Sequence, residues 1–119
     1  APLLTKLKTY MAAPDRYADD KAKTPSVQLL AFLQTNVGLD YLLDKDYVGA
    51  LMDNYGIDAD LKAYLVRSYI FHKFEYALTG QDNIKNKAYN AMVDDYQDVT
   101  KKHPDLITGD MSAIMVKKS

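Results

Sequence analysis

Apolar residues recur at helical spacing along almost the whole 119-residue chain, and this periodicity limits the fold more than any other feature. They fall at positions i, i+3, i+4 and i+7, with almost no strict alternation of the kind that marks strands. The pattern predicts five to six helices of about 8 to 20 residues joined by short connections. We therefore expect an all-α fold, a compact single-domain bundle over residues 1–119.

The first third of the chain is predicted to hold two helices. Apolar residues 3, 4, 7, 10 and 11 form one stripe, which stops before Pro14 because the residue preceding a proline is disfavoured in the α region. Residues 15–23 are charged and poor in apolar side chains, so they are predicted as a loop. Thr24 and Pro25 then suit a helix start. That helix is expected to end near Gly38, with a short apolar turn over residues 39–43.

Aspartates stand where four later helices are expected to begin, and there a short carboxylate accepts backbone N–H bonds. The longest and most apolar of these helices is predicted from about Ala59 to Leu78. Gly56 and Gly80 suit the left-handed position that follows a helix. The predicted caps are Asp44, Asp58, Asp82 and Asp110.

Composition excludes several classes of protein. The 16 acidic residues nearly cancel the 15 basic ones, so a nucleic-acid binder, which needs surplus cations, is not expected. The chain has no Cys, which removes disulfides, thiolate catalysis and Cys-based metal sites. No apolar run approaches the roughly 20 residues that span a bilayer. We expect a soluble protein, cytoplasmic or secreted after signal removal, since Ala1 suits either origin.

Two stretches of the chain resemble each other when it is shifted by 41 residues. Residues 50–55 pair with residues 91–96, within the longer stretches 47–70 and 88–111. Pro104 would then fall opposite Ala63, inside the longest helix, so the two copies could not share helix boundaries. The alternatives are a true internal repeat and two amphipathic helices with a common pattern.

Tyrosine is the most unusual component, because the chain has ten Tyr and no Trp. A tyrosine buries a large ring and keeps a hydroxyl for water, a ligand or a partner. The helix over residues 59–78 is apolar nearly all round, so it is predicted to be central or covered by a partner. Its candidate ligand-binding or partner-binding residues are Tyr64, Tyr69, Phe71, His72 and Tyr76.

His72 is the most informative titratable residue, because helical spacing places it on the apolar face. It could ligate haem or a metal, or act as a buried general base. The favoured interpretation is a structural histidine hydrogen-bonded to a backbone carbonyl or a tyrosine hydroxyl. A second open question is the run of Asp94, Asp95 and Asp98, where helix propensity would prefer Glu. These three are the candidate residues for a bound cation or for a partner's lysines.

Part of the chain resembles two families of small helical proteins. Residues 30–67, with the turn Tyr55-Gly56-Ile57-Asp58, are similar to the small helical subunit of the protocatechuate 4,5-dioxygenase family and to the helical leader domain of borosin-type peptide precursors. In those families an acid-capped helix and then a Leu-x-x-Gly-Asp step follow the turn, and in this chain Arg67-Ser68-Tyr69 stands in place of the Gly-Asp step. The resemblance implies a protein that docks on a partner and does no chemistry itself.

Three functions follow from these observations. The first is a non-catalytic accessory or interaction protein that docks on a partner subunit, or self-associates, through tyrosine-rich helices. The second is a carrier of a small aromatic or haem-like ligand in a pocket near His72. The third is a precursor peptide whose tail, residues 113–119, is modified. Autonomous catalysis is not expected, because no phosphate loop or nucleophile motif occurs, and the sequence identifies no cofactor.

Overall fold

The computed structural model describes residues 2–12, 15–21, 28, 30–31, 35, 44–54 and 56–118. These residues hold six α-helices and no strand, which confirms an all-α compact bundle. No helix in this part of the chain is long and apolar enough to cross a lipid bilayer. The elements are α1 (Pro2–Met11), α2 (Arg16–Lys21), α5 (Lys45–Met52), α6 (Ala59–Leu78), α7 (Ile84–Lys102), a 3-10 turn η1 (Pro104–Leu106) and α8 (Gly109–Ile114).

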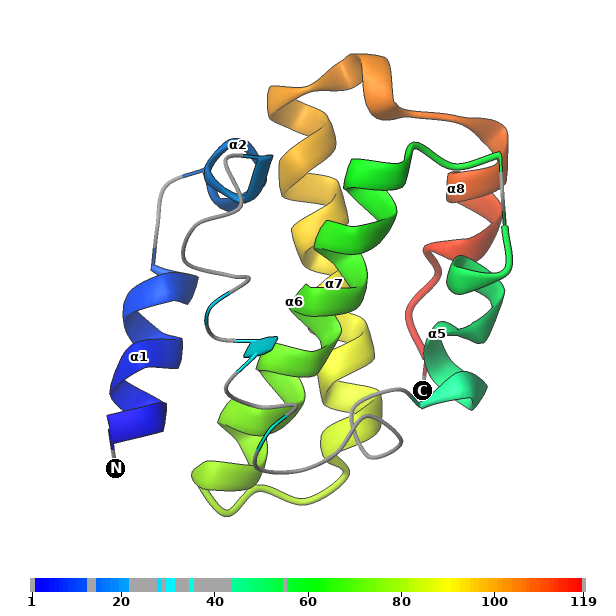
Figure 1. Cartoon of the computed structure of the whole chain (residues 1–119). Coiled ribbons are helices and arrows are strands. Elements are labelled where there is room, and N and C mark those ends of the chain that lie inside the picture. Colours follow the sequence, from blue (N-terminus) through cyan, green and yellow to red (C-terminus); the bar gives the residue numbers. More distant parts are fainter. Residues whose placement is uncertain are drawn as a thin grey trace.

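Helix α6 is the centre of the bundle. Figure 1 shows α6 and α7 side by side and antiparallel, with α1 and α2 on one side of the pair and α5 and α8 on the other. The central position predicted from the apolar character of α6 is therefore confirmed, and helices of the same chain cover it. Its buried residues are Leu61, Tyr64, Leu65, Ser68, Tyr69, Ile70, Phe71, Lys73 and Phe74.

Both ends of α6 lie where the sequence predicts them. At its start, Asp58 is the N-cap, and its carboxylate accepts a hydrogen bond from the Leu61 backbone N–H at 2.9 Å. At its end, Gly80 has a φ of +73°, which a side chain would disfavour. Local chemistry at two residues thus defines the longest helix.

Replacing Asp58 by alanine is expected to lower the free energy of unfolding by about 1 kcal/mol, because α6 loses the acceptor for one N-terminal N–H group. Asp58→Asn keeps an acceptor in the same place, so its free energy of unfolding is expected to differ from that of the parent protein by only a few tenths of a kcal/mol. Urea unfolding followed by circular dichroism measures both. Equal losses in the two variants would show that charge, and not capping, explains the effect.

Two of the predicted caps, Asp82 and Asp110, do not occupy the N-cap position of their helices. Helix α7 begins after Asn83, which adopts a left-handed φ of 50°, while the 99% exposed Asp82 carboxylate lies 3.3 Å from the Lys87 ammonium. Helix α8 begins after Thr108, whose hydroxyl accepts the hydrogen bond from the backbone N–H three residues on. Asp110 lies inside that helix and is not its cap.

The end of α5 also differs from the prediction. Its last residue is Met52 and its C-cap is Asp53. Gly56 therefore does not occupy the left-handed position directly after the helix, where it was predicted. Instead, the Gly56 N–H donates to the Asn54 side-chain oxygen at 2.9 Å, which forms a local turn. Because α7 continues through the residues matched to this turn, the stretches 47–70 and 88–111 have different helix boundaries.

Helix α2 corrects the prediction of a loop over residues 15–23. Its residues Arg16 and Tyr17 are only 8% and 3% exposed, so the segment is stabilised by tertiary contacts and not by an apolar stripe of its own. The predicted helix over residues 24–38 and the turn over 39–43 lie outside the described residues, apart from 28, 30, 31 and 35.

Candidate functional site

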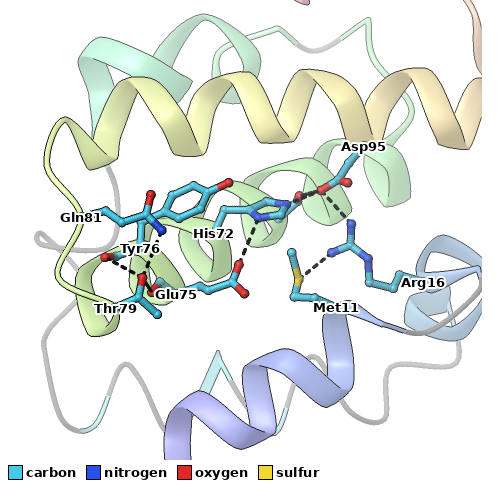
Figure 2. A network of polar contacts seen from close by, with 9 residues as sticks. Met11, Arg16, His72, Glu75, Tyr76, Thr79, Gln81 and Asp95 are labelled. Carbon is cyan, nitrogen blue, oxygen red and sulfur yellow. Dashed lines mark hydrogen bonds and ion pairs between the residues drawn. The ribbon is translucent and has the colours of Figure 1, made fainter.

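A cluster of buried polar side chains joins α2, α6 and α7 (Figure 2). The Asp95 carboxylate accepts hydrogen bonds from His72 Nε2 and Arg16 Nη2, each at 2.7 Å, and from the Ser68 hydroxyl. The side chains of Arg16, His72 and Asp95 are only 8%, 13% and 14% exposed. We call Arg16, Ser68, His72 and Asp95 the polar cluster.

The polar cluster holds Asp95 in its ionised form. Burial raises the pKa of this carboxyl, but the hydrogen bond and charge of His72, the charge of Arg16 and the hydrogen bond from Ser68 lower it to about 2. An ionised carboxylate only accepts hydrogen bonds, so His72 Nε2 carries the proton between them. His72 Nδ1 faces Glu75, whose Oε1 lies 3.8 Å away. A carboxylate with such a low pKa is a poor general base, and the arrangement is that of an ion pair fastening α2 to the central helices.

Arg16 is the cation of the cluster and is surrounded by protein on several sides. Its guanidinium lies 5.6 Å from the centre of the Tyr10 ring and 5.5 Å from that of Tyr64. Its Nη1 donates to the Met11 sulfur at 2.8 Å (Figure 2). Burial lowers the pKa of Arg16, but the charge of Asp95, the hydrogen bond to it and the electrostatic interactions with Tyr64 and Tyr10 together raise it above its ordinary value. Arg16 therefore stays charged, and the ring faces and the carboxylate stabilise that charge.

The three aspartates predicted as a cation site do not converge. Asp94 pairs with the Lys117 ammonium at 2.7 Å, and Asp95 belongs to the polar cluster. Asp98 lines a cavity of about 130 Å³ beside that cluster. Within the described residues, no group of three or more His, Cys, Asp or Glu side chains could hold a metal ion. Asp94 and Asp95 are adjacent on α7 and point in different directions, whereas Asp95 and Asp98 lie one turn apart and line the same cavity.

The ring residues predicted as a ligand or partner site are separated in the structure. Tyr64, Tyr69 and Phe71 are at most 2% exposed. Tyr76 stacks on His72, with ring centres 6.0 Å apart, so the structure brings these two predicted residues together (Figure 2). Tyr69 faces α5 instead, where its hydroxyl donates to Asp44.

A second buried charge pair was not predicted from the sequence. Lys73 is 1% exposed, and its ammonium lies 2.8 Å from the Asp44 carboxylate, which also accepts from the Tyr69 hydroxyl at 2.6 Å. Asp44 occupies the N-cap position of α5 but makes no side-chain cap bond, so its predicted capping role is wrong. Burial raises the pKa of Asp44, but the hydrogen bonds from Lys73 and Tyr69 and the charges of Lys73 and Lys85 together lower it below its ordinary value. The available signal was a lysine among the apolar residues of α6.

An apolar groove of about 460 Å³ runs along the first half of α6 and was also missed. Its floor uses α6 positions 59, 62, 63, 66 and 67, which follow one helical stripe. Only two of its lining residues are charged, and both are cations. The lining consists of Leu30, Met52, Ile57, Ala59, Lys62, Ala63, Val66 and Arg67.

Comparison with known protein families, characterised proteins and solved structures returns no match for this chain. The resemblance to the small dioxygenase subunit and to the borosin leader domain therefore stays a prediction. A functional assignment has to rest on the geometry of the polar cluster and the groove.

Proposed function

We propose that this chain is a non-catalytic helical interaction protein that docks one amphipathic helix of a partner in the groove on α6. The observation that carries the proposal is the groove itself, an apolar depression of about 460 Å³ along the central helix. The function class is the one expected from the sequence. The contact surface is different, because Tyr64 and Tyr69 lie inside the protein.

The shape of the groove suits a helix. Ala59 and Ala63 are small and lie one turn apart on α6, which allows the axis of a second helix to come close. Met52, Ile57 and Val66 add apolar walls that a stripe of partner residues at i, i+3, i+4 and i+7 could fill. Contiguous apolar surface of this kind commonly marks a protein interface.

The charges on the lining select the partner's chemistry. Lys62 and Arg67 are cations, and the remaining lining residues are uncharged. A partner helix with acidic residues beside its apolar stripe would complement them, whereas a basic helix would be repelled. We therefore expect an acidic amphipathic helix.

The volume of the groove also supports a second candidate, a carrier of a small apolar ligand. Ligand sites commonly measure about 300–1,000 Å³, and the groove lies within that range. This candidate differs from the predicted carrier in using the groove and not the surroundings of His72. Native mass spectrometry of protein from its natural source would separate the two, since a carrier retains a mass above that of the chain.

Selection from a display library of helical peptides tests the docking proposal without a known partner. Peptides enriched on the parent protein are expected to carry an apolar stripe with acidic flanks. Ala63→Glu places a carboxylate in the groove and is expected to weaken binding at least about tenfold. Ala113→Glu adds the same charge at an exposed position on α8 and serves as the matched control, with unchanged affinity expected.

Lys62→Glu then tests the charge preference separately. It is expected to favour basic peptides over acidic ones, because it reverses one of the two cations of the lining. Enriched peptides that bind Ala63→Glu as well as the parent protein would place the interaction elsewhere and overturn the proposal. Enrichment of basic peptides on the parent protein would also overturn it.

A further inference from the structure

The C-terminal residues of the chain lie against α7, close to α5 (Figure 1), on a face that does not include the groove. The Asn90 side chain holds the backbone of Lys118 in two ways: its Nδ2 donates to the carbonyl oxygen at 2.8 Å, and its Oδ1 accepts from the N–H at 2.7 Å. A side-chain amide that pairs with both backbone groups of one residue recognises an exposed segment of main chain.

The Lys118 ammonium lies over two tyrosine rings. It is 5.0 Å from the centre of the Tyr89 ring and 5.5 Å from that of Tyr47. The two rings are tilted by 57°, so they form two walls of an open cage. The Tyr47 hydroxyl donates to Asn86 and the Tyr89 hydroxyl to the Ile114 carbonyl, each at 2.8 Å, and these bonds fix the ring orientations. Ring faces in this arrangement attract an alkylammonium group.

The neighbouring lysine is recognised by charge. The Lys117 ammonium lies 2.7 Å from the Asp94 carboxylate, and both side chains are about half exposed, at 52% and 56%. The face therefore contacts the main chain through Asn90, one ammonium through aromatic rings and the next through a carboxylate. Each of these is a contact that a lysine pair in another chain could make equally well.

We propose that Tyr47, Tyr89, Asn90 and Asp94 form a binding site for an extended partner segment that carries two adjacent lysines. Residues 116–118 of this chain occupy the site as a tethered competitor. In this site Asp94 binds a lysine of the partner, which is one of the two alternatives expected from the sequence.

The contacts explain why the tethered segment can be displaced. The ion pair is half exposed, and such pairs contribute little and weaken as salt increases. A short tether raises the local concentration of the segment to the millimolar range, which keeps a weak contact occupied. The apparent affinity of the site for an external segment is then reduced in proportion to the fraction of molecules whose site is open.

The test uses the full chain with Lys117→Ser and Lys118→Ser, and a synthetic peptide that copies residues 114–119. The ring resonances of Tyr47 and Tyr89 are followed by NMR during the titration. The peptide is expected to bind this double variant on the order of tenfold more tightly than it binds the parent chain. A peptide with norleucine in place of both lysines is expected not to bind.

Asn90→Ala in the double variant is expected to abolish peptide binding, because the main-chain contacts are lost. Gln97→Ala, an exposed polar change on the same helix, is the matched control and is expected to leave binding unchanged. Thermal unfolding verifies that each variant is folded. Equal affinity for the double variant and the parent chain, binding of the norleucine peptide, or undiminished binding to Asn90→Ala would each overturn the proposal.

Discussion

Asp44→Ala is expected to lower the free energy of unfolding at neutral pH by about 3–5 kcal/mol, the range measured when one partner of a buried ion pair is removed. The reason is Lys73, which is 1% exposed and would lose the carboxylate that lies 2.8 Å from its ammonium. The Tyr69 hydroxyl would lose its acceptor as well. Urea unfolding followed by circular dichroism measures the loss.

Two comparisons make this result specific. Asp46→Ala changes an exposed acid on the same helix and is expected to stay within about 0.5 kcal/mol of the parent protein. The double variant Asp44→Leu and Lys73→Met replaces both charges by apolar groups and is expected to recover most of the stability, because neither charge is then buried alone. A loss below about 1 kcal/mol for Asp44→Ala would mean that Lys73 reaches water or another carboxylate.

Asp95→Asn is expected to lower the free energy of unfolding by about 2 kcal/mol at pH 7, and by progressively less as the pH falls. The carboxyl has a folded pKa of about 2, below its ordinary value of 3.8, and this difference corresponds to about 2 kcal/mol. A lowered folded pKa contributes stability that is complete above about pH 4 and is lost as the pH falls toward 2. The difference between the two proteins should therefore be constant from pH 7 to pH 5 and shrink below pH 4.

Urea unfolding at a series of pH values measures this difference. Asp94→Asn is the matched control, because it changes the adjacent carboxylate in a half-exposed ion pair with Lys117, and an effect within about 1 kcal/mol is expected. A difference between Asp95→Asn and the parent protein that stays the same from pH 7 to pH 3 would show that the loss comes from packing. The ion pairs of the polar cluster would then not be its source.

The features predictable from the sequence are those that local chemistry determines. Helix α6 begins after a capping aspartate and ends before a glycine with positive φ, so its bounds follow from residues 58 and 80. Its central position follows from apolar residues on all its sides. Helix α2 was not predicted because its buried residue Arg16 is stabilised by Asp95 on α7, a residue that is distant in the sequence.

The contacts within the polar cluster could not be predicted from the sequence. His72 was expected to bond to a carbonyl or a tyrosine hydroxyl, but its partner is Asp95, one of the acids set aside as a cation site. Both residues were identified as unusual, and only the packing of α6 on α7 brings them together. Asp in place of Glu at this position is explained by the short side chain, which meets donors from two other helices at close range.

The methyl NMR signals of methionine test the docking proposal most directly, because methionines lie both in the groove and in the core. Met52 lines the groove, whereas Met92 and Met111 are 0% exposed in the interior. The titration adds a peptide selected for binding to the parent protein. We expect the Met52 signal to shift and to saturate with the peptide, while the Met92 and Met111 signals stay in place. A peptide that binds while the Met52 signal stays unmoved would show that the groove on α6 is not the docking site.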